Sequence, residues 1–296
     1  METNTMHIQT GIETSRTSVG GAGRAMDDRQ PVDIVVANDA HGAFVWGVLD
    51  RLLDQPDLCF GNITASGFGA MEAAVLAYGL ALGGQRGART ALTNFWRRVS
   101  HASMLMAEKA SPLRSILEQT IEIAEIRKKT CPVKLNIVAS NARTDAVKVF
   151  PSDQLSIDII LAAATVPFLF PAVEIDGDTY WGDGDVSVLP SFQAIEPGAQ
   201  LIIAGKPSGS MTPCSDHRVA AMPGTPNLAR TQTIFDTAHR AGATMFLRPW
   251  TDWGELTAMR DRGRKKVEDW LMADHFADDR SAVEKKGNMS RRLPPA

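Results

Sequence analysis

The sequence has few of the features that mark secreted scaffolds and nucleic-acid-binding proteins. Among its 296 residues are three cysteines, Cys59, Cys131 and Cys214, and no two of them form a Cys-x-x-Cys pair. So sparse a set argues against a disulfide framework and predicts a reducing, cytoplasmic compartment. The formal net charge of −3 is too small to favour nucleic acid as a partner or capture by an anionic membrane through charge alone.

Long uninterrupted apolar runs are also missing. The longest apolar stretch, residues 159–173, is broken by Pro167 and Pro171 and is shorter than the roughly 20 residues of a membrane-spanning helix. Residues 1–30 have no apolar segment of the kind a secretory signal needs, and they are rich in Gly, Ser and Thr. We therefore expect residues 1–30 to be a disordered tail, and translation could start at Met1 or at Met26.

The composition is that of a globular domain, with 44% hydrophobic and 22% charged residues. No repeat and no long linker divides the chain. The simplest organisation is one α/β domain over residues 31–276, followed by a polar C-terminal tail over residues 277–296.

Short β-branched runs alternate with helical patterns along the domain. Strands are predicted at residues 33–37, 59–64, 134–139, 148–150 and 200–204. Helices are predicted at residues 43–54, 70–82, 88–100, 111–127, 156–164, 228–241 and 255–274. The first two strands each lead through a turn into a helix, which is typical of an open α/β sheet.

Three loops beside predicted strands are candidates for a functional site. They are residues 38–42, 65–69 and 180–185, and all three contain Gly, with Asp in the first and third. Ligands of open α/β sheets bind at the carboxyl ends of the strands, where such loops meet helix N-termini. The alternative is that Gly and Asp serve only to make turns.

Several segments together resemble bacterial patatin-like phospholipases. The resemblance is carried by GAMEAAVLAYGLALGGQRGAR at residues 69–89, FWR at 95–97, ART at 142–144, AAATVP at 162–167, FPAVEIDG at 170–177, YW at 180–181, GR at 263–264 and WL at 270–271. It extends from about residue 32 to residue 276. The resemblance implies a patatin-like three-layer α/β/α fold with a mainly parallel central sheet, and lipid acyl hydrolase activity that needs no cofactor.

The resemblance also implies where the chemistry should lie. In that family a serine in a Gly-x-Ser-x-Gly elbow attacks the ester, an aspartate in an Asp-Gly turn pairs with it, and a Gly-rich loop binds the oxyanion. Elbow residues are small because the backbone there is strained, and the nucleophile needs a base within hydrogen-bond reach. In this sequence the nucleophile position is Gly67 and the first elbow glycine is Ala65, while Gly69 matches the last one.

The other two motifs also depart from the family pattern. The oxyanion loop reads Asn38, Asp39, Ala40, His41 and Gly42, so that only Gly42 is kept and His41 takes the usual basic position. The carboxylate of Asp39 has the wrong sign for an anion site. Asp183 fits the Asp-Gly turn if Gly182 is an insertion, with Asp185 in place of a small residue.

These departures predict that ester hydrolysis is impaired or lost, which would make the chain a pseudoenzyme. The alternative is an active serine hydrolase that uses Ser66, one residue before the expected nucleophile, with Asp183. Against this alternative, Ser66 can equally serve as a helix N-cap.

Other site types find little support in the sequence. His41 and Asp39 lie two residues apart with no third metal ligand near them, so no metal site is predicted. The glycines at 83, 84 and 87 do not indicate a nucleotide-binding loop, because such a loop follows a strand and these residues follow a predicted helix. A lipid or fatty-acid ligand and transient membrane contact are expected as partners. The acyl chain, the head group, any protein partner and the oligomeric state stay open.

Overall fold

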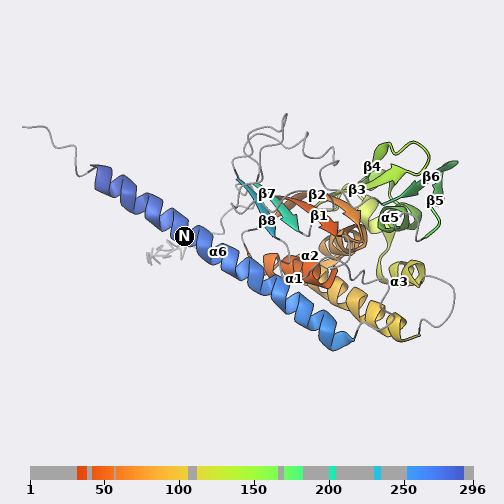
Figure 1. The fold of residues 1–296 in the computed structure, drawn as a ribbon, viewed down its shortest axis with the longest axis horizontal. Coiled ribbons are helices and arrows are strands. Elements are labelled where there is room, and N and C mark those ends of the chain that lie inside the picture. The colour runs from red at the N-terminus through yellow and green to blue at the C-terminus, as the bar shows by residue number, and fades with distance from the viewer. Residues whose placement is uncertain are drawn as a thin grey trace, which may run out of the picture.

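The computed structural model describes residues 32–38, 42–56, 58–105, 112–165, 170–182, 200–204, 230–234 and 252–289. The predicted N-terminal tail lies outside these ranges. Figure 1 shows a sheet with helices packed beneath it and one long helix that extends past the body.

The sheet has the strand order β5-β6-β3-β2-β1-β7-β8, and β4 pairs separately with β3. Its strands are β1 (Val32–Asn38), β2 (Phe60–Gly67), β3 (Lys134–Asn141), β4 (Val147–Pro151), β5 (Val173–Ile175), β6 (Asp178–Trp181), β7 (Gln200–Ala204) and β8 (Arg230–Ile234). The pairs β1–β2, β1–β7, β2–β3 and β7–β8 are parallel, and the pairs that involve β4, β5 and β6 are antiparallel. This confirms the predicted α/β class with a mainly parallel central sheet.

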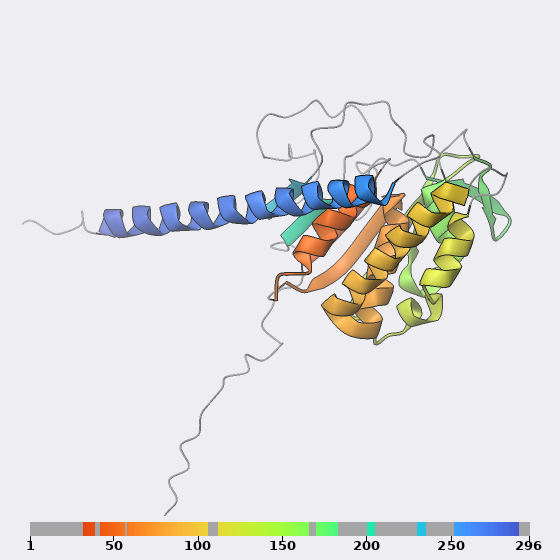
Figure 2. The ribbon, with the colours of Figure 1, turned by 90° about the horizontal axis from the view of Figure 1, so that it is seen from below.

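The helices are α1 (Gly42–Leu52), α2 (Gly69–Leu105), α3 (Leu113–Thr120), α4 (Ile123–Arg127), α5 (Ile157–Ala164) and α6 (Trp253–Met289). Figure 2 shows α1, α2 and α6 lying across the same face of the sheet. Alternate strand residues such as Ile34, Val36 and Ile63 belong to the buried core shared with these helices. The helical face of the sheet therefore carries the main core.

Helix α2 is a hairpin of two helical limbs. Gly83 and Gly84 leave helical geometry, and Gly84 has a φ of 57°. The limbs touch at two further glycines: a Cβ on Gly79 would lie 2.4 Å from the Ala88 Cα, and one on Gly87 would lie 2.4 Å from the Gly79 carbonyl oxygen. The predicted break after residue 82 is confirmed. The positive φ of Gly84 and the close return at Gly79 and Gly87 require glycine, whereas Gly83 has space for a side chain.

Helix α6 packs on α1 through a close backbone crossing. A Cβ on Gly47 would lie 1.9 Å from the Arg260 carbonyl oxygen, and one on Gly263 would lie 2.1 Å from the Phe44 carbonyl oxygen. The Arg260 guanidinium lies over the Trp46 ring, 5.0 Å from its centroid. Beyond this contact the 37-residue helix projects past the body (Figures 1 and 2). It extends further than the predicted end at residue 274.

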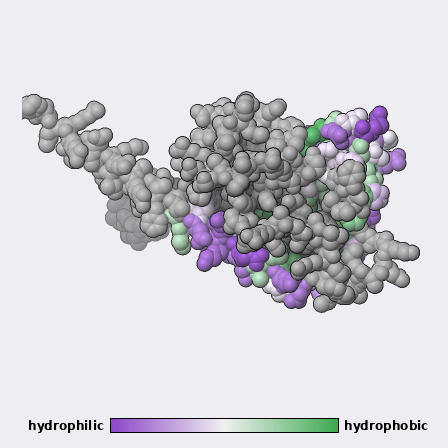
Figure 3. Space-filling model, viewed as in Figure 1, coloured by the Kyte–Doolittle hydropathy of each residue, from purple (hydrophilic) through white to green (hydrophobic). Residues whose placement is uncertain are grey.

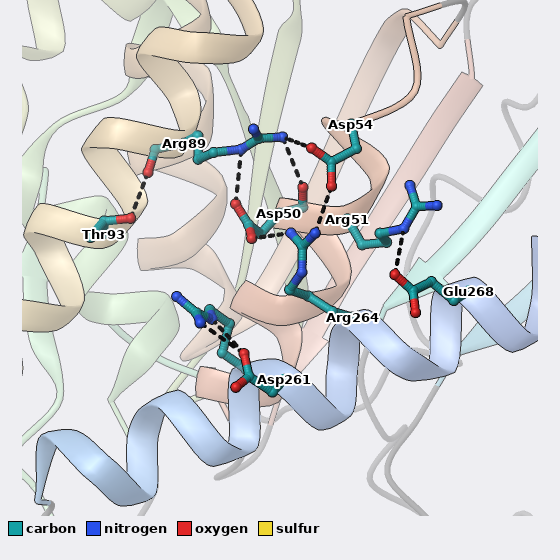
Figure 4. A network of polar contacts seen from close by, with 9 residues as sticks. Asp50, Arg51, Asp54, Arg89, Thr93, Asp261, Arg264 and Glu268 are labelled. Atoms are coloured by element: carbon teal, nitrogen blue, oxygen red, sulfur yellow. Dashed lines mark hydrogen bonds and ion pairs between the residues drawn. The ribbon is translucent and has the colours of Figure 1, made fainter.

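Four charged side chains join α1, α2 and α6 in a closed network (Figure 4). Arg264 pairs with both Asp50 and Asp54, and Arg89 pairs with the same two carboxylates. Burial raises the pKa of the Asp54 carboxyl, but hydrogen bonds to Arg264 and Arg89 and their charges outweigh it and leave that pKa below its ordinary value. The side chain of Asp50 is only 9% exposed, so each of its arginine partners compensates a largely buried charge.

Some predicted elements were wrong. Residues 230–234 form β8, in register with β7, where a helix over 228–241 was predicted; pairing with a neighbouring strand overrides the weak helical pattern. The predicted helix over 111–127 is two helices, α3 and α4, separated by Ile121 and Glu122 in extended conformation. The short strands β5 and β6 were not predicted, because three or four residues cannot display a period.

Candidate active site

The turn between β2 and α2 has the form of a nucleophile elbow. Strand β2 ends at Gly67 and helix α2 begins at Gly69, which leaves Phe68 alone between them. Gly67 has a φ of 59°, in the left-handed region that disfavours other residues. Gly67 is half-buried, whereas Ser66 and Phe68 on either side of it are buried. The residue at the apex of the turn thus has no side chain to act as a nucleophile.

Gly69 allows the helix to start directly against the sheet. A Cβ on Gly69 would lie 2.6 Å from the Val36 carbonyl oxygen and 2.9 Å from a Val36 methyl group. The N–H of Met71 donates to the Phe68 carbonyl at 3.0 Å, which closes the turn into the first helical turn. The last glycine of the elbow motif is therefore required by packing.

Ser66, one residue before the apex, is more deeply buried than Gly67. It is 1% exposed, and its Oγ has no hydrogen-bond partner among the described residues. Its neighbour Ala65 belongs to the core on the helical face of the sheet, and side chains alternate between faces along a strand. The Ser66 side chain therefore lies on the opposite face of the sheet from the helical core.

The candidate oxyanion loop joins β1 to α1 beside the elbow. Asn38, the last residue of β1, pairs in register with Gly67, and Gly42 begins α1. The loop starts next to the apex of the elbow and ends at a helix N-terminus, a position suited to binding an anion. Asp39, Ala40 and His41 lie outside the described residues.

Strand β6 brings a third segment to the same place. Strand β4 pairs with β3 from Asn136 to Ser140, and so occupies one edge of β3. Strands β2 and β6 therefore lie one after the other along the opposite edge of β3. Strand β2 pairs with β3 as far as Ile137, and β6 pairs with it at Ser140 and Asn141. Because β2 runs parallel and β6 antiparallel to β3, their carboxyl ends converge on the short gap between Ile137 and Ser140.

Gly182 follows β6 at this point and is held tightly by helix α5. Its N–H donates to the Thr165 carbonyl at 2.9 Å, and a Cβ at this position would lie 1.8 Å from the Ala163 carbonyl oxygen. The residue interpreted from the sequence as an insertion is thus one that only glycine can fill. Asp183, the candidate base, is the next residue and lies outside the described part of the chain.

A buried acid beneath the elbow was not predicted from the sequence. Glu72, in the first turn of α2, is fully buried and accepts a hydrogen bond from the Trp96 Nε1–H at 3.2 Å. Trp96 also contacts the Phe68 ring, with 5.7 Å between ring centroids. These contacts tie the elbow to the second limb of α2. The sequence feature that could have pointed to Glu72 is an acidic residue in the first turn of a predicted helix.

The described residues offer little else of the kind a site needs. They contain no group of three or more His, Cys, Asp or Glu side chains that could hold a metal ion. Nor do they include a helix with the length and apolar character to cross a membrane. A surface hollow of about 330 Å³ lies on α6 and not at the elbow, and it is lined by Asp261, Arg264, Lys265, Glu268, Asp269 and Met272. The hydrophilic side chains along this part of α6 are visible in Figure 3.

Two solved structures align with most of this chain. Among solved structures, VipD from Legionella pneumophila aligns with a TM-score of 0.47 and 10% identity, over 82% of this chain and 67% of VipD. The type III effector protein ExoU aligns with a TM-score of 0.42 and 13% identity, over 82% of this chain and 53% of ExoU, so this chain spans about half of its length.

No curated protein matches the sequence significantly. The family model described as patatin-like phospholipase matches residues 40–188, a span that includes the elbow, β3, α5, β6 and Gly182. The chain therefore belongs to the patatin-like phospholipase family.

Proposed function

We propose that this chain is a patatin-like acyl hydrolase homologue that binds a lipid or fatty acid and has lost most or all ester hydrolysis. The observation that carries the proposal is Gly67 at the apex of the elbow, with a φ of 59°. The backbone has the form of an elbow, and the position that the resemblance assigns to the nucleophile holds a residue with no side chain. Loss of the serine in a well-studied protease lowers turnover by a factor of about 10⁶, so a chain with glycine here is expected to be nearly inactive.

A second candidate function is an active serine hydrolase that uses Ser66 with Asp183. The Ser66 hydroxyl favours it, since it is buried with no hydrogen-bond partner in the described part of the chain, and such a group requires an explanation. Two features of Ser66 oppose it. The side chain is 1% exposed, and strand alternation directs it to the face of the sheet away from the helices. An ester carbonyl would need access to a buried atom.

A water-soluble fluorophosphonate probe, which marks activated serines, separates the two candidates. The wild type, Gly67→Ser and Ser66→Ala would be labelled in parallel and assayed on a short-chain ester. Gly83→Ser is the matched control for an added serine, because a Cβ on Gly83 meets no atom within 4 Å. We expect Gly67→Ser alone to be labelled.

Labelling of the wild type that disappears in Ser66→Ala would overturn the proposal and establish the second candidate. If Gly67→Ser is silent like the wild type, the loss of hydrolysis stands and extends to the oxyanion loop or to Asp183. Binding of a lipid is tested separately with a fluorescent fatty acid. Absence of saturable binding by the wild type would contradict the ligand part of the proposal. The cytoplasmic compartment stays a prediction.

A further inference from the structure

A lysine on the edge strand β4 is held by aromatic side chains. The Lys148 Nζ lies 4.7 Å from the centroid of the Phe150 ring and 5.1 Å from that of the Tyr180 ring. It also donates a hydrogen bond to the Tyr180 hydroxyl at 3.3 Å. The two rings are buried and pack edge to face, with 5.4 Å between their centroids. Lys148 itself is half-buried, so its flexible side chain is ordered before any ligand binds.

This ammonium has no anionic partner in the part of the chain that the structure describes. Its interactions there are those with the two rings and with the phenol oxygen. The carboxylate that β6 carries, Asp178, pairs instead with Arg143 at 3.4 Å. An ammonium has three N–H donors, and a phenol that accepts one hydrogen bond still has its own O–H to donate. Lys148 and Tyr180 therefore form a pair of donors that can receive an anion.

The donor pair lies at the end of the sheet that carries the candidate site, where β3, β4 and β6 lie together in Figure 1. Lys148 pairs with Ala139 on one edge of β3. On the other edge, β2 is paired as far as Ile137, and two further residues along each strand bring Gly67 level with Ala139. The Cα atoms of Gly67 and Lys148 are then two strand spacings apart, roughly 10 Å. This carboxyl end of the strands is where open α/β sheets bind ligands.

We propose that Lys148 and Tyr180 bind the carboxylate of a free fatty acid, so that this chain holds the acid and not its ester; this rests on the proposed function. The ammonium pairs with the carboxylate, and the Tyr180 hydroxyl donates to the same group. Hydrogen bonds to an ionised acceptor are about twice as strong as those between neutral groups. An ester carries no charge, so it gains less from the same two donors.

The charges around the donor pair favour an anion with a single charge. Lys148 supplies one positive charge. The hairpin of β5 and β6 carries Glu174, Asp176 and Asp178, and Arg143 pairs with the last of these. One ammonium neutralises a carboxylate, whereas a phosphate monoester carries about two negative charges at neutral pH and would keep one of them beside these acids. The pair also lacks the planar fork of an arginine, which matches phosphate oxygens two at a time.

Calorimetric titration of the full chain with decanoate and with decanol tests the proposal, because the two ligands have alkyl chains of matched length and differ in charge. The wild type is expected to bind decanoate about tenfold more tightly than decanol. Lys148→Met should remove that preference and leave the affinity for decanol unchanged, whereas Lys148→Arg should keep it. Tyr180→Phe should lower the affinity for decanoate about threefold. The matched control is Lys134→Met, the same change at an exposed lysine where β3 begins.

Equal decanoate affinities of Lys148→Met and the wild type would overturn the proposal. So would an equal loss for decanoate and decanol in Lys148→Met, which is the result expected of a lysine that only supports the fold. Tighter binding of decyl phosphate than of decanoate would assign the pair to a phosphate instead. Equal binding of decanol and decanoate by the wild type would overturn the carboxylate site alone. If the wild type binds none of the three ligands, the ligand part of the proposed function fails with it, and the fluorophosphonate result stands by itself.

Discussion

Glycine has opposite consequences in two regions of this molecule. At the α1–α6 interface, Gly47 and Gly263 let two helices approach until a Cβ would overlap a carbonyl oxygen of the other helix. At the elbow, Gly67 relieves a backbone conformation that costs other residues about 1–2 kcal/mol, and it leaves the apex of the turn without a side chain. The interface owes its stability to two glycines without side chains at the crossing and to the charged side chains beside it. The elbow has the backbone of a nucleophile turn, and under the proposed function it lacks the nucleophile itself.

The comparison implies that stability and chemistry are held by different residues, so substitutions in the two regions should have different readouts. Interface substitutions should lower the free energy of unfolding. Elbow substitutions should change it little, and in one case should raise it.

The largest loss is expected for Gly47→Ala. Its new methyl group would lie 1.9 Å from the Arg260 carbonyl oxygen, which is part of the helix backbone and cannot rotate away. Helix α6 would have to separate from α1, and we expect a loss of about 3 kcal/mol or more, as for severe overpacking. Urea denaturation measures it. Gly83→Ala is the control, because its Cβ meets nothing within 4 Å; equal stability of the two variants would contradict the close crossing.

Arg264→Ala should have the next largest effect. It removes one of the two cations that compensate the buried Asp50 and one of the two that pair with Asp54. We expect a loss of about 1–3 kcal/mol, less than for a fully buried pair because Arg89 remains. The measurement is the urea midpoint at constant slope. A double-mutant cycle with Asp50→Asn separates the pair from the general packing of α6, and additive effects of the two changes would show that the pair is not coupled.

Sequence reasoning succeeded where long patterns repeat and failed where tertiary contacts decide. The first two strand–turn–helix units, the break at Gly83 and Gly84, and the family itself follow from extended apolar periods and many matched positions. The five residues of β8 were predicted as helix because pairing with β7 is not visible in a local pattern. Strands β5 and β6 are too short for a period, although they position the third part of the site.

Within the site, sequence indicated which residues matter but not how they are held. The motif predicted Gly67 at the nucleophile position and Gly69 as the last elbow glycine; the structure adds the positive φ of Gly67 and the close contact of Gly69 with Val36. The need for glycine at position 182 was not predicted, because its contact with Ala163 joins segments that are separated along the chain. Glu72 was missed because its Trp96 partner lies on the other limb of α2.

Gly67→Ser should cost the elbow only a little stability. Serine at a φ of 59° is strained by about 1 kcal/mol, and the fold should otherwise accept it at a half-buried position. Denaturation of the wild type, Gly67→Ser and Gly67→Ala would test this. The two variants should lose similar amounts because the backbone sets the cost. A loss above about 3 kcal/mol, comparable with Gly47→Ala, would mean that the apex is packed and not open.

Ser66→Ala carries the smallest expected change and the sharpest contrast with the interface. The Ser66 hydroxyl is buried without a hydrogen-bond partner among the described residues, so it loses hydration on folding and gains no hydrogen bond from them in return. Alanine removes that penalty at the expense of a very small void, and stability should stay equal or rise by up to about 1 kcal/mol. Calorimetry of the two proteins at the same pH measures it. A loss of more than about 1 kcal/mol would show that the hydroxyl has a partner, and would make Ser66 part of a polar network and not an unused side chain behind an elbow without a nucleophile.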